Sequence, residues 1–329
     1  MPTPEYLILR ELTAHEPKWV SGAALAAKLD VSRVTVWHHM SKLRAQGFEF
    51  EARRSLGYRL AVRPSFPHAA LIEPLLKVRP RGFTLEVHDE IDSTNDEAAR
   101  QLAEGRAAPF AVLARRQTRG RGRFGRTWHS ASNGNLYASF AFRPGVSPDR
   151  MQTFTLWMGV NICELIVNFA RVTPGLKWPN DILFDGRKAG GMLTEARVDA
   201  DQIRDLVFGL GLNVNSPAGS WPGELARSAV SLSEVAGAPL DLNRLAAALI
   251  GRVLLAYDRF VAGHHRATFA DLWNRYDVLK GRRVAVLEGG RRHPGTVVGV
   301  DDEGSLILRD DRGRARPFRA GEVSLEKAG

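Results

Sequence analysis

The sequence predicts a protein of the α+β class that contains more than one domain. Strand-like and helix-like segments in the middle of the chain lack the regular alternation of a parallel doubly wound sheet. From residue 280 onward, short strand-like runs are separated by glycines, which is typical of a small β-barrel or sandwich. Because 329 residues exceed what a single core usually reaches, we expect a mixed, largely antiparallel central sheet flanked by two smaller domains.

The composition narrows the class of protein. Hydrophobic residues make up 44% of the chain and charged residues 25%, as in an ordinary globular protein. The net charge of +10 favours acidic partners such as nucleic acid, phosphates or nucleotides. The single cysteine, Cys163, excludes an internal disulfide framework and a cysteine-based zinc site. Since no leader-like N-terminus or long uncharged apolar stretch is present, we expect a soluble, cytoplasmic protein without a membrane partner.

Residues 1–63 are predicted to form a winged helix-turn-helix, a DNA-binding domain. Ser21 and Ser32 stand where N-caps are expected, and a basic turn separates two alternating segments. Two short helices joined by a tight turn and followed by a β-wing define this fold. The predicted elements are helices over Tyr6–Leu12, Gly22–Leu29 and Arg33–Ala45 and strands over Phe48–Ala52 and Tyr58–Val62.

The third of these helices would enter the major groove of DNA. Its inward residues recur at helical spacing, at Val36, Met40 and Leu43, so the remaining side chains point outward. Trp37 does not fit this pattern well, because it is a bulky aromatic residue on a face that should be exposed to solvent. The alternative to DNA binding is a winged-helix module that is used only for protein contacts or dimerisation. The candidate DNA contacts are Arg33, Thr35, His38 and His39 on the helix, with Lys42 beside them, and Arg53 and Arg54 on the wing.

The rest of the chain divides into four predicted parts. These are a linker with a short helix (residues 64–80), a central domain (81–262), a connecting helix (263–279) and a small β domain (280–329). The expected central strands are Phe83–Asp89, Phe110–Arg115, Asn135–Phe142, Leu176–Trp178, Ile182–Phe184, Gly191–Arg197 and Leu206–Asn213. The expected central helices are Thr94–Glu104, Met151–Ala170 and Asn243–Val261. The expected C-terminal strands are Arg283–Leu287, His293–Val300, Leu306–Arg309 and Ala315–Phe318.

Residues 115–126 form the most unusual segment, with six arginines, three glycines and no acid. Gly120, Gly122 and Gly125 match the dinucleotide fingerprint literally, but turn-forming residues 127–134 and another strand follow instead of a helix. Kinase and Walker A motifs are also missing. We therefore expect a cationic loop whose charges repel each other when it is empty and which orders around an anion. A solvated nucleic-acid-binding loop is the alternative.

Two other segments help to decide between a loop that orders around an anion and a solvated nucleic-acid-binding loop. Thr94 and Glu97 are spaced as a capping box, which explains a hydroxyl there without any function. Capping does not explain Lys177-Trp-Pro-Asn-Asp181 at the end of a strand, nor Arg187-Lys188 beside glycines. A lone lysine next to glycines is usually a solvated turn residue, and that interpretation stays open for Lys188.

Taken together, these residues resemble the biotin protein ligases, specifically the bifunctional type that is also a biotin operon repressor. The match is ordered and covers nearly the whole chain. It comprises the winged helix, Asp92-Ser-Thr-Asn95, Gln117 with Gly120–Arg126, Lys177–Asp181, Arg187-Lys188, Gly209-Leu-Gly-Leu-Asn213 and the small β domain. The resemblance implies a catalytic domain of the biotin/lipoate ligase type followed by a small SH3-like β-barrel.

The resemblance also implies a biotin–[acetyl-CoA-carboxylase] ligase reaction in two steps. Biotin and ATP give biotinyl-5′-adenylate, and a lysine of the biotin carboxyl carrier protein then takes the biotin. Mg²⁺ would come with ATP and not from a protein metal site. Operator DNA and a homodimer are the other implied partners. The implied biotin-binding residues are Ser93, Thr94, Asn95, Gln117, Arg121, Gly122, Arg123 and Lys188, and the implied nucleotide-side residues are Trp128, Asn180 and Asn213.

The residue types suit this chemistry. A carboxylate and a triphosphate about 4 Å apart repel by about 4 kcal/mol at an effective dielectric constant of about 20. Lys188, Arg121 and Arg123 are the candidate catalytic cations that would offset this repulsion. Thr94 and Gln117, with Asn95, offer donors and acceptors for the neutral ureido group of biotin. A glycine-hinged loop would also keep the reactive adenylate from water.

Three rival functions remain open. A lipoate–protein ligase or octanoyltransferase shares the implied fold, but the arginine-dense loop and the two flanking domains argue against it. A regulator that only senses biotin would not need Lys188 and the loop arginines. A monofunctional ligase with a non-regulatory winged helix is compatible with everything in the sequence.

Overall fold

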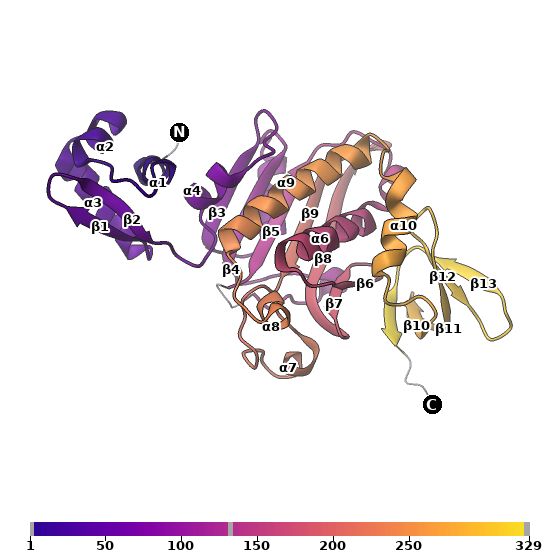
Figure 1. The fold of residues 1–329 in the computed structure, drawn as a ribbon. Helices are drawn as coiled ribbons and strands as arrows, with labels where there is room; N and C mark the ends of the chain where they lie inside the picture. Colours follow the sequence, from indigo (N-terminus) through magenta and orange to yellow (C-terminus); the bar gives the residue numbers. More distant parts are fainter. Residues whose placement is uncertain (1–2, 131–133, 326–329) are drawn as a thin grey trace. The chain divides into compact units, whose positions relative to one another are not determined.

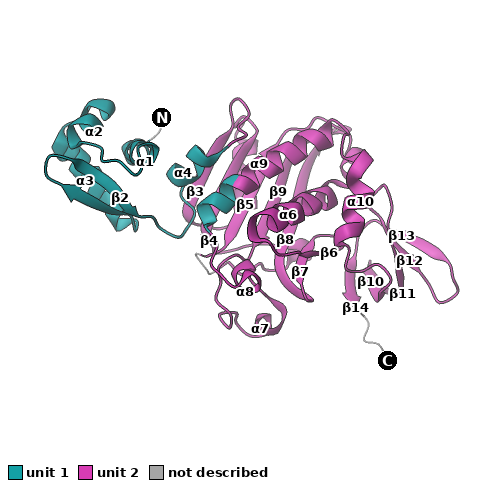
Figure 2. Cartoon of the chain, viewed as in Figure 1, with its two compact units in different colours: residues 1–76, 241–247 teal, residues 77–240, 248–329 magenta. Residues whose placement is uncertain are grey.

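The computed structural model describes residues 3–130, 134–324 and the backbone of Leu325, so Ala131–Asn133 of the predicted turn lie outside the described residues. The chain divides into two compact units (Figure 2). The first contains residues 1–76 and 241–247, and the second contains residues 77–240 and 248–329. Each unit is described separately below.

The first unit contains the predicted winged helix-turn-helix. Ser21 Oγ accepts a hydrogen bond from Ala24 N, and Ser32 Oγ accepts one from Thr35 N, so both predicted caps are confirmed. Val36, Met40 and Leu43 are buried, which confirms the inward face of the third helix. The elements are α1 (Pro4–Ala14), α2 (Gly22–Leu29), α3 (Arg33–Ala45), β1 (Glu49–Arg53) and β2 (Gly57–Val62), with β1 antiparallel to β2.

One predicted outward residue of α3 is not outward. His39 is only 15% exposed, and its Nδ1 lies 2.9 Å from a carboxylate oxygen of Glu5 on α1. The prediction that His39 faces solvent is therefore wrong, because a helix packed beside α3 supplies a hydrogen-bonding partner. On the wing, the guanidinium of Arg53 lies over the Trp19 ring, 5.2 Å from its centroid.

The segment expected to be a linker packs as part of the first unit. α4 (Ala69–Ile72) and the 3₁₀ turn Glu73–Leu75 replace the single predicted helix, and Ala70 and Leu71 join the core beneath α1. Asn243 contributes from far along the chain, since its Oδ1 accepts a hydrogen bond of 2.8 Å from His68 N.

In the described part of the second unit, a central mixed sheet has seven strands (Figure 1). Their order is β3-β4-β5-β9-β8-β7-β6, with only β3 and β4 parallel to each other. This confirms the mixed, largely antiparallel prediction. The strands are β3 (Thr84–Ile91), β4 (Phe110–Gln117), β5 (Leu136–Phe142), β6 (Gly175–Lys177), β7 (Asp181–Phe184), β8 (Arg187–Asp199) and β9 (Gln202–Leu212).

Helices cover both faces of this sheet. α5 (Thr94–Ala103) packs Ala98 and Leu102 against one face. α6 (Phe154–Ala170) and α9 (Leu242–Val261) cover the other, where Phe154 contacts Phe208. Residues 148–170, which include α6, are long and apolar enough by length and composition to cross a membrane, yet they are mostly buried and hold Cys163 as a core thiol.

A second sheet forms the C-terminal part of this unit. Within the described residues it has five antiparallel strands in the order β13-β12-β11-β10-β14, which confirms the predicted small β domain. The predictions missed β14, and they also missed two short helices, α7 (Leu225–Ser228) and α8 (Leu232–Ala236). The C-terminal elements are α10 (Arg266–Tyr276), β10 (Arg283–Glu288), β11 (Arg291–Val300), β12 (Leu306–Arg309), β13 (Ala315–Phe318) and β14 (Glu322–Leu325).

Candidate active site

A cavity of about 510 Å³ opens beside the N-terminus of α5. It brings together segments that are far apart in the sequence: the start of α5, the arginine-rich loop, residues 177–181, and strands β8 and β9. The predicted site residues that line it are Ser93, Thr94, Asn95, Gln117, Arg121, Gly122, Arg123, Trp128, Asn180 and Lys188.

Ser93, and not Thr94, caps α5. Ser93 has extended backbone angles, and its Oγ accepts a hydrogen bond from Asp96 N at 3.3 Å. The predicted capping box built on Thr94 is therefore wrong by one residue. Thr94 is instead the first helical residue, and both its N–H and its hydroxyl donate to Oε1 of Gln117, at 2.7 and 3.1 Å. The polar side chains at this end of the cavity are thus held by one another.

Ser139 lies beneath this group and was not predicted. Its hydroxyl is fully buried on β5, 2.8 Å from the Thr94 hydroxyl and 2.6 Å from Oδ1 of Asn95. Nδ2 of Asn95 in turn donates to a carboxylate oxygen of Glu195 on β8 at 2.7 Å. The only sequence signal for Ser139 is a hydroxyl within an otherwise apolar strand.

Glycines on adjacent strands form the floor of the cavity. Gly191 pairs with Gly211 in the β8–β9 ladder, and the Trp128 ring lies so close above them that a Cβ at Gly211 would overlap it. A Cβ at Gly209 would overlap the side chain of Asn95 in the same way. These glycines therefore let two predicted ligand-binding side chains approach the sheet.

Cations gather at the other end of the cavity. Nζ of Lys188 lies 2.6 Å from Oδ1 of Asp181 and 5.3 Å from the centroid of the Trp128 ring. Lys177 also lines the cavity, and burial lowers its pKa; Lys188 lowers it further, while Asp181 opposes the shift. Lys188 is thus a cavity residue and not a solvated turn residue.

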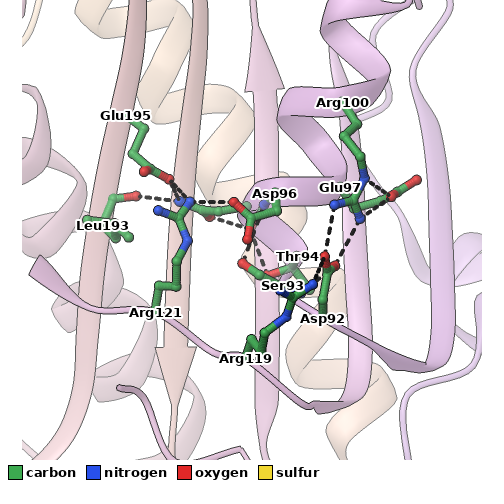
Figure 3. A network of polar contacts seen from close by, with 12 residues as sticks. Asp92, Ser93, Thr94, Asp96, Glu97, Arg100, Arg119, Arg121, Leu193 and Glu195 are labelled. Carbon is green, nitrogen blue, oxygen red and sulfur yellow. Dashed lines mark hydrogen bonds and ion pairs between the residues drawn. The ribbon is translucent and has the colours of Figure 1, made fainter. Parts of the chain in front are cut away.

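Acids from other parts of the fold neutralise the arginine-rich loop (Figure 3). Arg121 bridges Asp96 and Glu195 at 2.6 and 2.9 Å, and Arg119 lies 3.3 Å from Asp92. The loop arginines therefore have acidic partners in the empty protein, although, besides burial, repulsion by Arg126 still lowers the pKa of Arg123. The compensating carboxylates are distant in sequence, on α5, on β8 and in the residue pair that precedes α5, so the local sequence could not reveal them.

The C-terminal sheet supplies one wall of the cavity, and no motif in the sequence indicated this. Leu287 on β10 and Glu322, Val323 and Ser324 on β14 line it. Arg126 forms an ion pair with Glu322, and Nη1 of Arg123 donates to Gly321 O at 3.2 Å. Burial lowers the pKa of Arg123. The loop is thus anchored on one side by the C-terminal domain.

The two predicted asparagines differ in their placement. Asn180 lines the cavity, and its Nδ2 donates to Met192 O at 2.7 Å. The described lining does not include Asn213, whose buried amide donates to Lys188 O and Val230 O at 3.2 and 3.1 Å. Asn213 thus fixes the backbone that carries Lys188, and its contact with the nucleotide stays a prediction.

Fold and site together define a ligase of the biotin/lipoate class. The model of the biotin/lipoate A/B protein ligase family matches residues 87–213, and that of the biotin protein ligase C-terminal domain matches residues 280–326. A helix-turn-helix domain model matches residues 5–59.

Relatives extend this match over nearly the whole chain. The bifunctional ligase/repressor BirA of Bacillus subtilis is 33% identical, over 92% of this chain and 93% of that protein. The biotin–[acetyl-CoA-carboxylase] ligase of Mycobacterium tuberculosis is 31% identical over 80% of this chain and 96% of its own. The biotin protein ligase of Aquifex aeolicus, solved with biotin and ATP, superposes with a TM-score of 0.61 at 27% identity, over 74% of this chain and 99% of that one. The chain therefore belongs to the family of bifunctional biotin protein ligases and repressors.

Proposed function

We propose that this protein is an ATP-dependent ligase that attaches biotin to the carboxyl carrier protein of a carboxylase, in the cytoplasm. One observation carries the proposal. A single cavity holds neutral hydrogen-bonding side chains at one end, Lys188 and Arg123 at the other, and Trp128 over a glycine floor between them. This arrangement fits a ligand that has an uncharged polar head, an anionic centre and an aromatic base.

The neutral end suits the ureido group of biotin. Gln117 and Thr94, already hydrogen-bonded to each other, offer both donors and acceptors to that group. The valerate carboxylate then extends towards Lys188. Because these side chains are fixed before binding, little rotamer entropy is lost when biotin enters.

The first chemical step joins two anions. An oxygen of the biotin carboxylate attacks the α-phosphorus of ATP, the bond to the bridging oxygen breaks, and pyrophosphate leaves. Lys188 and Arg123 stabilise the negative charge that develops on the phosphoryl oxygens, and Trp128 stacks against the adenine. No covalent bond to the enzyme forms.

In the second step, the uncharged ε-amine of the acceptor lysine attacks the biotinyl carbonyl. The carbon–oxygen bond to AMP breaks, AMP leaves as an anion, and the amine loses a proton to form the amide. Until then the arginine-rich loop covers the mixed anhydride and excludes water.

Mg²⁺ enters this scheme as part of the ATP complex and screens the charge of the pyrophosphate. Two carboxylates line the described cavity, Asp181 and Glu322, and each already forms an ion pair, with Lys188 and Arg126 respectively. This donor set fits a metal that the nucleotide carries better than one held by protein ligands.

The decisive experiment supplies the full-length protein with ATP, Mg²⁺, biotin and a biotin carboxyl carrier domain, followed by a blot for biotin. Biotinylated carrier that requires ATP is the expected result. Parallel reactions with lipoate and octanoate test the rival activity, and preferential transfer of either acid would overturn the proposal. Binding of biotin without formation of adenylate or biotinylated carrier would favour the biotin-sensing regulator instead.

We further propose that the first unit binds operator DNA as a biotin-responsive repressor and that the protein dimerises on DNA. The helix-turn-helix match and the exposed cations of α3 and the wing support this role. A gel shift with the protein's own biotin-synthesis promoters, with and without adenylate, tests it. A monofunctional ligase would give no shift under either condition.

A further inference from the structure

The outward side of α3 carries apolar side chains that the fold of the first unit does not use. Val34 is 65% exposed and Trp37 is 52% exposed. The Trp37 ring meets the ring of His38, which is also exposed, edge to face with centroids 5.2 Å apart. Large apolar groups that remain in water on a recognition helix indicate a binding role rather than a packing role.

Cations of α3 lie on either side of this apolar stripe, and the acid that pairs with one of them, Glu5 on α1, lies 3.5 Å from Nζ of Lys42. Within α3, Arg33 stands at the beginning and Lys42 and Arg44 in the last turn, and the helix contains no acidic residue. Arg54 on the wing is also exposed. In duplex DNA the phosphates border the major groove and the base edges lie between them. The charge pattern therefore complements DNA, with cations for the phosphates and an uncharged stripe for the bases.

The residue types in the stripe restrict what it can read. Arg and Lys read guanine, and Asn and Gln read adenine, through paired hydrogen bonds. α3 contains no Asn or Gln, and Val34 and Trp37 cannot make paired hydrogen bonds. The apolar group that the major groove offers is the C5-methyl group of thymine.

We infer that Val34 and Trp37 read thymine methyl groups in the major groove, so that each half-site of the operator contains thymines where these side chains enter. This inference rests on the proposed DNA binding and specifies its sequence preference. In this proposal, Val34 and Trp37 determine which base sequence is preferred, and Lys42 and Arg54 contact phosphates whatever the sequence.

The test removes the methyl group and nothing else. Full-length protein, supplied with biotin, ATP and Mg²⁺, selects duplexes from a random library, and the recovered duplex is resynthesised with deoxyuridine in place of each thymine in turn. We expect about a fourfold loss of affinity for each methyl group contacted, which is the factor expected for burying one such group.

Variants connect the effect to the residues. Trp37→Ala and Val34→Ala should bind the thymine and deoxyuridine duplexes more nearly equally. Leu75→Ala is the matched control, because Leu75 is 41% exposed in the same unit but lies outside the winged helix; it should discriminate like the original protein. Lys42→Ala should weaken binding to both duplexes equally and lower the salt dependence by about one ion.

The outcomes separate the inference from the function on which it rests. If no duplex is recovered at low salt, the proposed DNA binding fails and the inference fails with it. If a duplex binds but deoxyuridine has no effect, DNA binding stands and the inference is overturned. If Trp37→Ala abolishes self-association in light scattering and leaves thymine discrimination intact, a second copy of the chain covers this face and the inference is also overturned.

Discussion

The ammonium nitrogen of Lys188 lies 2.6 Å from a carboxylate oxygen of Asp181, on the neighbouring strand of the central sheet. Asp181 ends the Lys177–Asp181 segment and Lys188 lies near the start of β8, so the β7–β8 hairpin fixes their separation. The ion pair keeps the lysine at the cavity wall beside Trp128. In the proposed reaction, Asp181 therefore positions Lys188, and Lys188 presents its charge to substrate.

Lys188→Ala should reduce pyrophosphate release at least about 100-fold, because it removes a fixed cation from the site of developing charge. The melting temperature should change little, since the lysine is partly exposed. Arg187→Ala is the matched control: Arg187 pairs with Glu234 and does not belong to the described lining. Normal pyrophosphate release by Lys188→Ala would refute the assignment.

Arg123→Gly should release free adenylate faster than the original protein. Arg123 donates to Gly321 O, so its loss removes both a cation and one attachment of the loop to the C-terminal domain. The adenylate dissociation rate, measured by rapid dilution, should rise by at least about tenfold, from the loss of a charge-assisted hydrogen bond. Arg119→Gly, in the same loop but 79% exposed, should leave the rate nearly unchanged. An unchanged rate in Arg123→Gly would count against the loop as a lid.

Gly209→Ala and Gly211→Ala should damage different substrate sites. The added Cβ displaces Asn95 in the first variant and the Trp128 ring in the second. We therefore expect Gly209→Ala to raise mainly the KM for biotin, and Gly211→Ala mainly the KM for ATP. Gly251→Ala on α9 is the control, because its Cβ would make only ordinary contact. If each variant raised the KM for biotin and the KM for ATP equally, the two glycines would not serve separate substrate sites, and the prediction would be wrong.

Ser139→Ala should weaken biotin binding by about 30-fold, because two contacts that hold Thr94 and Asn95 are lost, at about 1 kcal/mol each. The KM for ATP should not change. Ser216→Ala removes another buried hydroxyl, which contacts Asn135 outside the described cavity. That control should lower the melting temperature without affecting biotin binding; an equal loss of biotin affinity would assign Ser139 a general stabilising role.

The free energy of unfolding at low pH should depend on the ionisation of the Asp92 carboxyl group. Hydrogen bonds from Arg100 are the main cause that lowers the pKa of Asp92 to about 2, while partial burial opposes the shift. The stabilisation by the ionised form is thus complete above the ordinary pKa of about 4 and is lost as the pH falls through about 2. Asp92→Asn should lower the free energy of unfolding by about 1 kcal/mol at neutral pH, since the pair is partly exposed. Denaturant titrations of both proteins should converge near pH 2, and a constant difference down to that pH would contradict the linkage.

Local sequence was sufficient to predict those features of the structure that depend on residues close together in the chain. Ser21 and Ser32 end helices through bonds to residues three positions away, and the inward stripe of α3 follows from helical spacing alone. The ordered motifs likewise located the cavity residues from Ser93 to Lys188. Errors arose where a distant partner decided the outcome, as with Glu5 beside His39.

The sequence by itself determined the class of fold, the two terminal domains and three of the cations that line the cavity, because spacing and residue type are properties of the chain. Only the tertiary structure decided which acids neutralise the loop, that Ser139 lies beneath Thr94, that Asn213 supports the backbone of Lys188, and that β14 walls the cavity. These features depend on side chains and glycines that are far apart in the sequence and that the fold places next to each other. Coulombic attraction and close packing act over distances in space and not along the sequence.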